Sequence, residues 1–474
     1  MNVYTIFGSV AAVAFALALV RFVVKRPPNI LITFLQDFVG VFFMFSGFVK
    51  AVDPLGTSYK MHEYFEAFSA EGFRPFWEYI AGFSTFFAIA MIALELFIGL
   101  MLVIGWKPRL TTGIIWLLTL FFTFLTGYTY LSGFCISKLF LVLAALVMIL
   151  FGTVAFPQKT TTRNNLAFFS VGIMIILLLL SKFSGHLFMC DFSESGMKVT
   201  DCGCFGDFIK LKPWETFYKD IILDLLIIIL LLNEKHIRPL FSAGSNTGIA
   251  FVGGLFSILF CLHNVYSNEP VIDFRPYKIG SDIKDERIEK KAPKIEMTFV
   301  MMNSKTKEQK EFSYEDVMAN RIDRNVYDTQ IKRIDKVLDP GIPAKIVNLR
   351  IEDEDNELTD SLLSNPNYSL MVVAFNLSKT HEEAFNQLNA IAAGADKAGV
   401  KFYTVTVNDG RIDDFRHRNN AAYPFYYADE TPLKTMIRSN PGLILLKNGV
   451  VINKWHYRHL PTFEELNQMY FSKK

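Results

Sequence analysis

The sequence predicts an α-helical membrane bundle followed by an α/β domain outside the bilayer. The chain has 474 residues, of which 51% are hydrophobic and 46 are phenylalanine, and its mean hydropathy is +0.28. This composition is too apolar for an ordinary soluble protein. Residues 1–266 consist mainly of apolar stretches, whereas residues 267–474 carry most of the charge. We therefore expect a membrane domain over 1–266, a linker with short strands over 267–343, and a folded domain over 344–474.

Eight stretches are long and apolar enough to cross a bilayer as helices. They lie near residues 3–24, 31–51, 79–105, 111–131, 138–156, 166–184, 216–232 and 247–266. The first stretch has no basic residue before its apolar run and no small-residue cleavage site after it. We therefore expect it to be a retained span and not a cleaved signal peptide.

The basic residues of the short loops predict the orientation of these spans. The loops after the first, third, fifth and seventh spans contain Lys25 and Arg26, Lys107 and Arg109, Lys159 and Arg163, and Lys235 and Arg238, with one acid, Glu234. By the positive-inside rule these loops are cytoplasmic, so both termini lie outside. The sequence thus predicts a multi-pass protein of the inner (cytoplasmic) membrane with an extracytoplasmic C-terminal domain.

In this topology all five cysteines lie on the extracytoplasmic side, where disulfides persist. Cys202 and Cys204 are separated by one glycine, so a disulfide between them closes a small ring that departs from relaxed geometry and is easy to reduce. This favours a redox pair, with Cys190 or Cys135 as the shuttle or resolving thiol. The alternative is two structural disulfides and a buried Cys261.

A zinc site formed by His186, Cys190, Cys202 and Cys204 is a third interpretation. Structural zinc prefers cysteine pairs that are two to four residues apart, and one intervening glycine fits this preference poorly. We therefore predict no metal site.

Ionisable residues within or near the predicted spans are candidates for a polar or cofactor-binding pocket. A charge in hydrocarbon is costly and usually faces the bundle interior or water. The candidates are Lys50, Glu95, Lys219, Asp220 and Asp224. The last three follow the cysteine loop directly, and Asp220 and Asp224 share a helix face because they are four residues apart. The alternatives are lysines that extend to the membrane surface and an interhelical hydrogen bond for Glu95.

The outer loop 52–78 is aromatic and amphipathic, which predicts a helix on the membrane surface. This helix is either part of an interfacial aromatic belt or a lid over a site.

The polar part of the chain predicts a linker and then alternating strands and helices. The charged segment 281–294 reads as a mobile linker, and short alternating runs at 295–301 and 344–351 suggest strands. From residue 368 the expected order is strand 368–376, a helix to 398 capped by Ser378 or Thr380, strand 401–407, helices 409–418 and 432–438, a hairpin of 442–446 and 450–455 around Asn448-Gly449, and helix 461–470.

The order of elements over 368–474 resembles a thioredoxin-like domain. Asn440-Pro441, just before the third strand, matches the position of the cis-proline of that fold. Redox-active members carry Cys-x-x-Cys after the first strand, where this chain reads Asn-Leu-Ser-Lys-Thr-His at 376–381. No cysteine follows Cys261. The resemblance therefore implies a redox-inactive binding or docking domain.

Three motifs make residues 30–235 similar to the DoxX family, and within it to the MauE-type branch of methylamine utilisation proteins. They are Ser46-Gly47-Phe48-Val49-Lys50 with Asp53-Pro54, Glu95-Leu96-Phe97-Ile98-Gly99, and Asp201-Cys202-Gly203-Cys204-Phe205-Gly206 followed by Lys219-Asp220. The family has a four-helix core, so the fifth and sixth predicted spans look like an insertion. The resemblance implies a membrane redox or disulfide-handling role, with a quinone as the candidate cofactor.

Two functions follow as hypotheses. The first is a membrane thiol-disulfide oxidoreductase that acts on the periplasmic side, with Cys202 and Cys204 as the active pair, a quinone in the bundle as electron carrier, and a client protein presented by the distal domain. The second is a non-enzymatic scaffold or maturation factor whose thioredoxin-like domain docks a partner protein. Apart from the lipid bilayer and such a periplasmic partner no further partner is expected, since a net charge of +2 gives no indication of nucleic-acid binding.

Overall fold

The computed structural model divides the chain into two compact units, Met1–Arg275 and Pro276–Lys474. It describes residues 3–25, 27, 29–134, 148–156, 159–169, 172, 196–199, 201–266, 269–339 and 341–472.

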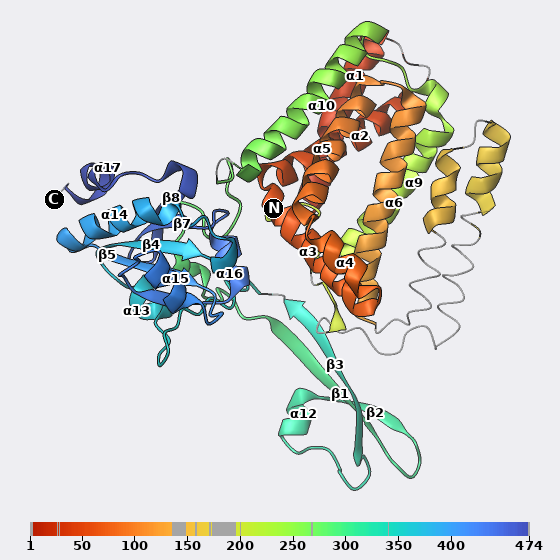
Figure 1. The fold of residues 1–474 in the computed structure, drawn as a ribbon. Coiled ribbons are helices and arrows are strands. Elements are labelled where there is room, and N and C mark those ends of the chain that lie inside the picture. Colours follow the sequence, from red (N-terminus) through yellow and green to blue (C-terminus); the bar gives the residue numbers. More distant parts are fainter. Residues whose placement is uncertain are drawn as a thin grey trace. The chain divides into compact units, whose positions relative to one another are not determined.

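The first unit is a bundle of helices (Figure 1). In chain order these are α1 (Val3–Lys25), α2 (Ile30–Val52), α3 (Pro54–Glu71), α4 (Arg74–Ala81), α5 (Ser84–Ile104), α6 (Pro108–Ser132), α9 (Pro213–Leu232) and α10 (Ala243–Tyr266). The described parts of 135–200 are helical at 148–152 and 160–169.

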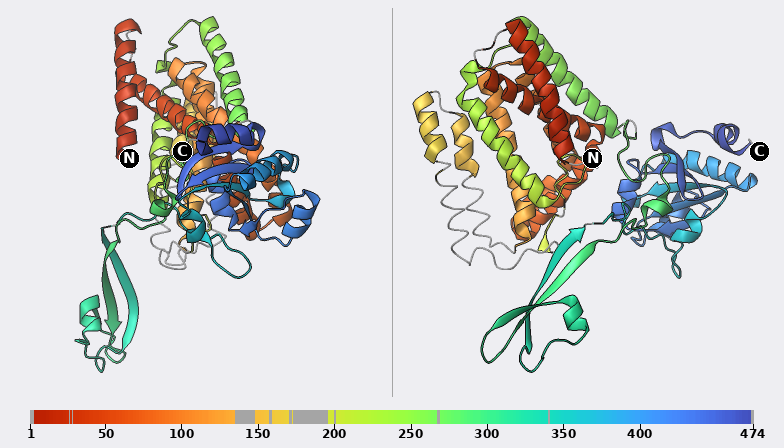
Figure 2. Two further views of the ribbon diagram at one scale, coloured as in Figure 1. Left: turned by 90° about the vertical axis from the view of Figure 1, so that its left-hand side faces the viewer. Right: turned by 180° about the vertical axis from the view of Figure 1, so that it is seen from behind.

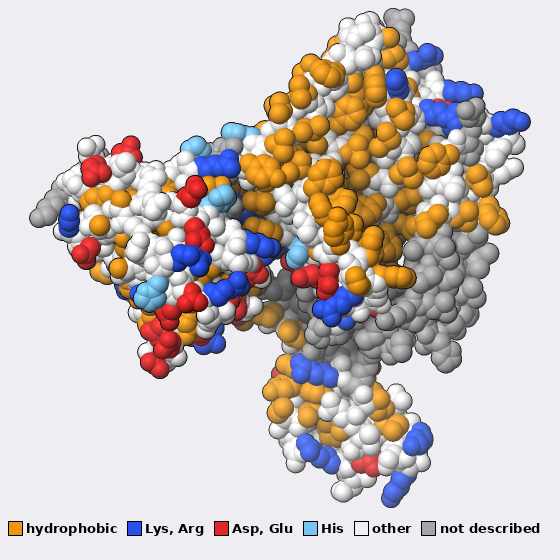
Figure 3. Space-filling model, in the orientation of Figure 1, with side chains coloured by type: hydrophobic (Ala, Val, Ile, Leu, Met, Phe, Trp, Pro, Cys, Tyr) orange, Lys and Arg blue, Asp and Glu red, His pale blue; other side chains and the backbone are white. Residues whose placement is uncertain are grey.

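Five helices of the described chain are long and apolar enough to cross a membrane. They are Tyr4–Val24, Ile30–Val52, Ser84–Ile104, Pro108–Ser132 and Ala243–Tyr266, and they coincide with the first four predicted spans and the eighth. Helix α9 covers the seventh predicted span but carries four charged residues. The fifth and sixth predicted spans fall largely outside the described residues. Hydrophobic side chains cover the visible face of this helical unit (Figure 3).

Asp53-Pro54 both ends one helix and begins the next. The backbone N–H of Asp53 closes α2 on the carbonyl of Lys50, and the Asp53 carboxylate accepts a hydrogen bond from the N–H of Gly56 at the start of α3. Proline suits the first helical position because the N–H that it lacks has no partner there. The predicted helix-end signature is therefore a sharp change of direction from α2 into α3.

Glycines bring α2 and α5 close together. A Cβ atom at Gly99 of α5 would lie 2.8 Å from the backbone nitrogen of Met44 and 2.9 Å from the carbonyl oxygen of Gly40, both on α2. A Cβ atom at Gly47 would lie 3.0 Å from the backbone of Leu96. Close backbone approach through small residues is a common mode of helix packing in membranes.

The loops that carry the basic residues meet at one end of the bundle. The Arg21 guanidinium donates to the carbonyl of Arg238, and the N–H of Leu240 donates to the carbonyl of Ile104. Arg163 pairs with Glu234 at 3.1 Å. Helices α3 and α4 and the Cys-Gly-Cys loop follow the opposite ends of α2 and α6 along the chain, so they lie at the other end of the bundle (Figure 1).

The predicted surface segment 52–78 forms two helices, α3 and α4. Helix α3 buries one face, which includes Thr57, Met61, Tyr64 and Phe65. The Tyr64 hydroxyl hydrogen-bonds to that of Thr129 on α6, at 2.6 Å. Helix α3 thus packs inward on the bundle, whereas Phe73, Phe76 and Tyr79 are exposed, so the lid and the interfacial belt both stay predictions.

The second unit contains a five-stranded sheet with the order β6-β5-β4-β7-β8. The strands are β4 (Tyr368–Ala374), β5 (Lys401–Thr406), β6 (Phe425–Tyr427), β7 (Gly442–Lys447) and β8 (Val450–His456). Strands β4, β5 and β6 are parallel to one another, whereas β7 is antiparallel to both β4 and β8. The β7–β8 turn is Asn448-Gly449, as expected, and both residues have positive φ.

Helices cover both faces of this sheet, because successive side chains of a strand point to opposite faces. Leu370 and Val372 of β4 pack with α14 (Ala384–Lys397) and α17 (Phe463–Leu466). Met371 and Val373 pack on the other face with α13 (Thr359–Leu363) and α16 (Glu430–Met436). Helix α15 (Ile412–Arg418) joins the first of these cores through Phe415.

Residues before this sheet form a second, three-stranded sheet with the order β2-β1-β3. Its strands are β1 (Lys294–Met302), β2 (Gln309–Ser313) and β3 (Thr329–Asp339), with the short helix α12 (Tyr314–Met318) after β2. Figure 2 shows this sheet as a long twisted ribbon. The predicted strand at 295–301 therefore corresponds to β1.

The structure differs from the prediction at several places in this unit. Residues 281–294 are not a free linker at their start, because Ile283 is fully buried and its N–H donates to the carbonyl of Gly449. Residues 344–351 form no strand. The helix expected from Ser378 or Thr380 begins only at Ala384, after a short 3-10 turn at Leu377–Lys379 that the Asn376 side chain caps.

Candidate functional site

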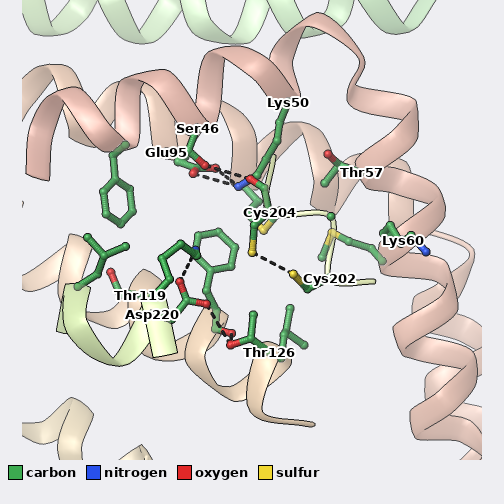
Figure 4. A pocket seen from close by; sticks show the side chains of 18 of the residues that line it. Ser46, Lys50, Thr57, Lys60, Glu95, Thr119, Thr126, Cys202, Cys204 and Asp220 are labelled. Atoms are coloured by element: carbon green, nitrogen blue, oxygen red, sulfur yellow. Dashed lines mark hydrogen bonds and ion pairs between the residues drawn. The ribbon is translucent and has the colours of Figure 1, made fainter. Parts of the chain in front are cut away.

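The Cys-Gly-Cys segment forms a tight turn just before α9. The Asp201 carboxylate accepts the N–H of Gly203, and the Gly203 carbonyl accepts the N–H of Gly206, each at 3.0 Å. Both glycines have positive φ, +63° and +52°, a conformation that other residues rarely adopt. The turn leaves the Sγ atoms of Cys202 and Cys204 3.2 Å apart as free thiols (Figure 4).

The thiols face a small cavity that is lined by residues of α2, α3, α5, α6 and α9. About 40 Å³ inside it is open to the centres of water molecules. Since one water needs at least roughly 10–15 Å³, the cavity is large enough to hold water. Four of the five predicted pocket residues line it, namely Lys50, Glu95, Lys219 and Asp220.

Lys50 and Glu95 form an ion pair that is almost completely buried. The Lys50 ammonium lies 2.7 Å and 3.0 Å from the two carboxylate oxygens of Glu95, and the side chains are 4% and 2% exposed. The ammonium also lies over the ring of Phe122, 4.7 Å from its centroid. The carboxylate therefore neutralises a lysine inside the bundle, so this lysine does not extend to the membrane surface.

A second polar cluster connects α9 with α6. Lys219 donates to Asp220 at 2.5 Å, and Asp220 accepts a hydrogen bond from Thr126 at 3.0 Å. Asp224, one turn along α9, accepts a hydrogen bond from Thr123 at 2.6 Å and is not among the residues that line the cavity. The predicted common face of Asp220 and Asp224 is thus turned towards threonines of α6.

Lys219 also lies beside the cysteine turn. Its ammonium is 5.7 Å from the ring centroid of Phe205, the residue that follows Cys204. The hydrogen bond from Cys204, together with the charge of Lys219, lowers the pKa of Cys202 below its usual range. The same hydrogen bond and burial raise the pKa of Cys204. Cys202 is therefore the thiol that more readily becomes the nucleophilic thiolate.

The charged side chains that line the cavity are already paired. Its three lysines, Lys50, Lys60 and Lys219, each contact a carboxylate, so none of them is left to bind a quinone oxygen. A quinone therefore stays a prediction from the sequence.

The remaining cysteines do not share the cavity. Cys261 is fully buried on α10 beside Ala51 and Ile92. Cys135 and Cys190, the predicted shuttle or resolving thiols, lie outside the described residues, as does His186. Among the described residues, no group of three or more His, Cys, Asp and Glu side chains could hold a metal ion.

Sequence reasoning missed the residues that α3 contributes to the site. The α3 residues that line the cavity are Thr57, Lys60, Met61 and Tyr64. The aliphatic part of Lys60 lies over Gly203: a Cβ atom on this glycine would be 3.2 Å from Cγ of Lys60. The amphipathic character of 52–78 indicated that this segment has a buried face but not what that face covers. The sequence indicated Ser46 only as part of a motif and not as a site residue. In the structure its hydroxyl donates a hydrogen bond to the carbonyl of Cys204 at 3.2 Å.

The chain leaves the helical unit beside the cysteine turn. Phe274 packs on Phe208 with ring centroids 4.8 Å apart. Arg275 is 1% exposed and is held by Glu269 and Asp273 at 3.0 Å and 2.7 Å. The segment that precedes Pro276 is therefore fixed to the same end of the bundle as the thiols.

Comparison with known proteins agrees with the membrane assignment. Searches of curated proteins and of solved structures found no match to this chain. A family model matches residues 28–137, which contain α2 to α6 and the Lys50–Glu95 pair but end before the cysteine turn. That model is the methylamine utilisation protein MauE, to which residues 28–137 are therefore similar. Together with the five helices that are long and apolar enough to cross a membrane, this similarity indicates a multi-pass membrane protein.

Proposed function

We propose that this protein is a membrane thiol-disulfide oxidoreductase that acts on the extracytoplasmic side, which is the periplasm in a cell with two membranes. The observation that carries the proposal is the pair of free thiols, 3.2 Å apart, at the wall of a cavity inside the bundle. A strained or easily opened disulfide is typical of catalytic and not of structural disulfides. A cation near the pair favours the thiolate that starts the exchange.

The reaction is an exchange of one disulfide for another. The Cys202 thiolate attacks a disulfide of a partner protein, so that a mixed disulfide forms and one partner sulfur leaves as a thiolate. Cys204 passes its proton to that thiolate and attacks the Cys202 sulfur. The Cys202–Cys204 disulfide forms, and the second partner sulfur is released as a thiolate. Two electrons pass to the partner, and the reverse sequence oxidises a partner dithiol.

The distribution of charge supports this side of the membrane. The basic loops meet at one end of the bundle, and the thiols lie at the other. Basic loops are retained in the cytoplasm, so the thiol end faces outward, where disulfides persist.

The second unit presents a partner protein in this proposal. Its β4-α14-β5 unit, followed by the β7–β8 hairpin and α17, has the order of a thioredoxin-like domain, and the Asn440-Pro441 bond just before β7 is cis. Residues 376–381 contain no cysteine at the position of the redox motif. The domain therefore binds without exchanging electrons, and the DoxX-like helical core supplies the thiols.

The test is to trap the cysteines in native membranes after treatment with dithiothreitol or with a small disulfide oxidant. Acid quenching, maleimide labelling and mass spectrometry then give the state of each thiol. We expect Cys202 and Cys204 to change state together, and a Cys261→Ser variant to behave as wild type. If Cys202 and Cys204 keep one state under both treatments, the oxidoreductase proposal fails.

A scaffold or maturation factor is the second candidate, and the absence of any cysteine after Cys261 favours it. The match to a methylamine utilisation family is compatible with a role in the maturation of a partner enzyme. The double variant Cys202→Ser, Cys204→Ser separates the two candidates. If this variant folds and complements deletion of the gene in its host, the scaffold is favoured over the exchange reaction.

A further inference from the structure

The cavity beside the cysteine turn contains four sulfur-bearing side chains. Met61 of α3 and Met91 of α5 line it together with Cys202 and Cys204. None of the described residues that line it is a histidine, and its carboxylates, Glu95 and Asp220, are each paired with a lysine. Segments that are far apart in the sequence thus bring two thiols and two thioethers to one small enclosed space.

We propose that this cavity binds one monovalent copper ion, Cu(I), through the thiolates of Cys202 and Cys204, with the thioethers of Met61 and Met91 as additional ligands. Soft thiolate and thioether ligands select Cu(I). Zinc uses cysteine, histidine and carboxylate ligands, and magnesium and calcium use oxygen ligands. The carboxylates of the cavity already neutralise lysines, so the two thiols are the only zinc ligands that its described lining leaves free, and it leaves no oxygen set for magnesium or calcium.

The position of the two thiols suits a single ion. With metal–sulfur bonds of about 2.3 Å, the value for zinc thiolates, sulfurs 3.2 Å apart can both bind one ion in a bent arrangement. A bent arrangement leaves coordination positions open for the methionine sulfurs, whereas a linear one does not. A cavity that is large enough for water is also large enough for one bare ion.

The charges around the turn also suit a Cu(I) ion that is bound by two thiolates. Cu(I) bound by two thiolates carries one net negative charge. The Lys219 ammonium, which lies over the Phe205 ring beside the thiols, compensates such a charge in an apolar surrounding. Asp220 keeps the lysine in place through a hydrogen bond of 2.5 Å.

The inference does not depend on the exchange reaction, although the two uses of the thiols exclude each other. Copper binding needs both sulfurs as thiolates, so the Cys202–Cys204 disulfide abolishes it. A copper-loaded turn in the same way cannot attack a partner disulfide. A scaffold with permanently reduced thiols would still bind the ion.

The experiment titrates the full-length chain, reduced and in detergent under anaerobic conditions, with Cu(I) against a chromogenic Cu(I) chelator. We expect wild type to retain one Cu(I) per chain and the double variant Cys202→Ser, Cys204→Ser to retain none. The double variant Met61→Leu, Met91→Leu keeps the volume and the apolar character, and we expect its affinity to fall by about tenfold or more. X-ray absorption of the loaded protein should show sulfur ligands only.

Matched controls protect the result against misfolding and against other thiols. A Cys261→Ser variant should bind as wild type, because Cys261 lies beside Ala51 and Ile92 and does not line the cavity. Each variant is compared by size-exclusion chromatography and thermal unfolding. The proposal is overturned if the Cys202/Cys204 variant retains copper. It is also overturned if the methionine variant binds with wild-type affinity, or if the Cys261 variant loses the ion while it remains folded.

Discussion

Lys50 and Glu95 show what a buried charge requires inside a membrane bundle. Each charge loses the solvation of water, and only the partner at 2.7 Å makes this tolerable. The pair joins α2 to α5 next to the glycines that bring the two helices together, so the closeness of the backbones and the ion pair support one another.

We expect the single variants Lys50→Met and Glu95→Leu each to lower stability by about 3–5 kcal/mol, because each leaves one buried charge without its partner. The double variant Lys50→Met, Glu95→Leu should lose less than either single variant. Thermal unfolding in detergent, arranged as a double-mutant cycle, measures the coupling. Additive losses would contradict the ion pair.

His456, at the end of β8, makes the second unit sensitive to acid. Burial, assisted by the nearby charge of Arg458, lowers the pKa of His456 to about 4. Its Nδ1 accepts the backbone N–H of Arg458 at 3.2 Å, and protonation of Nδ1 would break this bond. The folded chain therefore holds the histidine neutral, whereas the unfolded chain protonates it near pH 6.5.

A folded pKa below the unfolded one means that the stabilisation is complete above about pH 6.5 and is lost as the pH falls towards 4. We expect a loss of about 2–3 kcal/mol over this range, measured by denaturant unfolding of the fragment 276–474. His456→Asn keeps an acceptor but does not titrate, so its stability should change less over the same range. The exposed His417→Asn serves as the control and should follow wild type.

At this scale the sequence identified the chemistry of the site but not its pairs. Lys50, Glu95, Lys219 and Asp220 stood out because charges within apolar stretches are rare. The partner of Lys50 is 45 residues away, and that of Lys219 is its neighbour; spacing alone does not distinguish these cases. Met61 and Met91 gave no signal, because a methionine in an apolar helix is ordinary.

Among the elements, α2 and α5 set the geometry of the site. Gly99 lies one turn from Glu95, and a side chain there would meet the backbone of α2. Because the contact is with backbone atoms and not with a flexible side chain, the helices themselves have to move.

We therefore expect Gly99→Leu to destabilise the protein by about 1–3 kcal/mol or more, although leucine is intrinsically the better helix former by up to about 1 kcal/mol. Melting temperature and the monodisperse fraction after detergent extraction measure the effect. Gly248→Leu on α10, where a Cβ atom has no neighbour within 4 Å, is the matched control and should not lower stability. Equal losses in the two variants would show that the helices are not tightly packed at Gly99.

Helices and strands were predicted correctly where the sequence pattern is long. The prediction failed for short segments, whose structure depends on their neighbours in the fold. Helices α1, α2, α5, α6 and α10 follow from apolar length alone. Strand β6, three residues long, was not predicted, and it exists because it pairs with β5. Residues 344–351 have an alternating pattern but no neighbouring strand to pair with, so they form none.

At the scale of the whole molecule, the chain separates charge by region. The helical unit exposes apolar side chains, as on α10, where Phe251 is 74% exposed and Phe256 is 63% exposed. In water such exposure would be unfavourable, whereas lipid covers it without cost. The second unit has its own apolar cores on both faces of a sheet and an exterior rich in charged residues. This division was predictable from the sequence, because residues 1–266 are mainly apolar and residues 267–474 carry most of the charge.

The distribution of basic residues also predicts how the chain is oriented in the membrane. Lys235 lies in an exposed loop at the basic end of the bundle, and Asp413 is 86% exposed on α15 of the second unit. In a background without the native cysteines, we expect Asp413→Cys to react with a membrane-impermeant maleimide in intact cells. Lys235→Cys should react only after the membrane is opened, because its loop carries the basic residues that are retained in the cytoplasm. The reverse pattern would place the thiol turn in the reducing cytoplasm, where a Cys202–Cys204 disulfide would not persist.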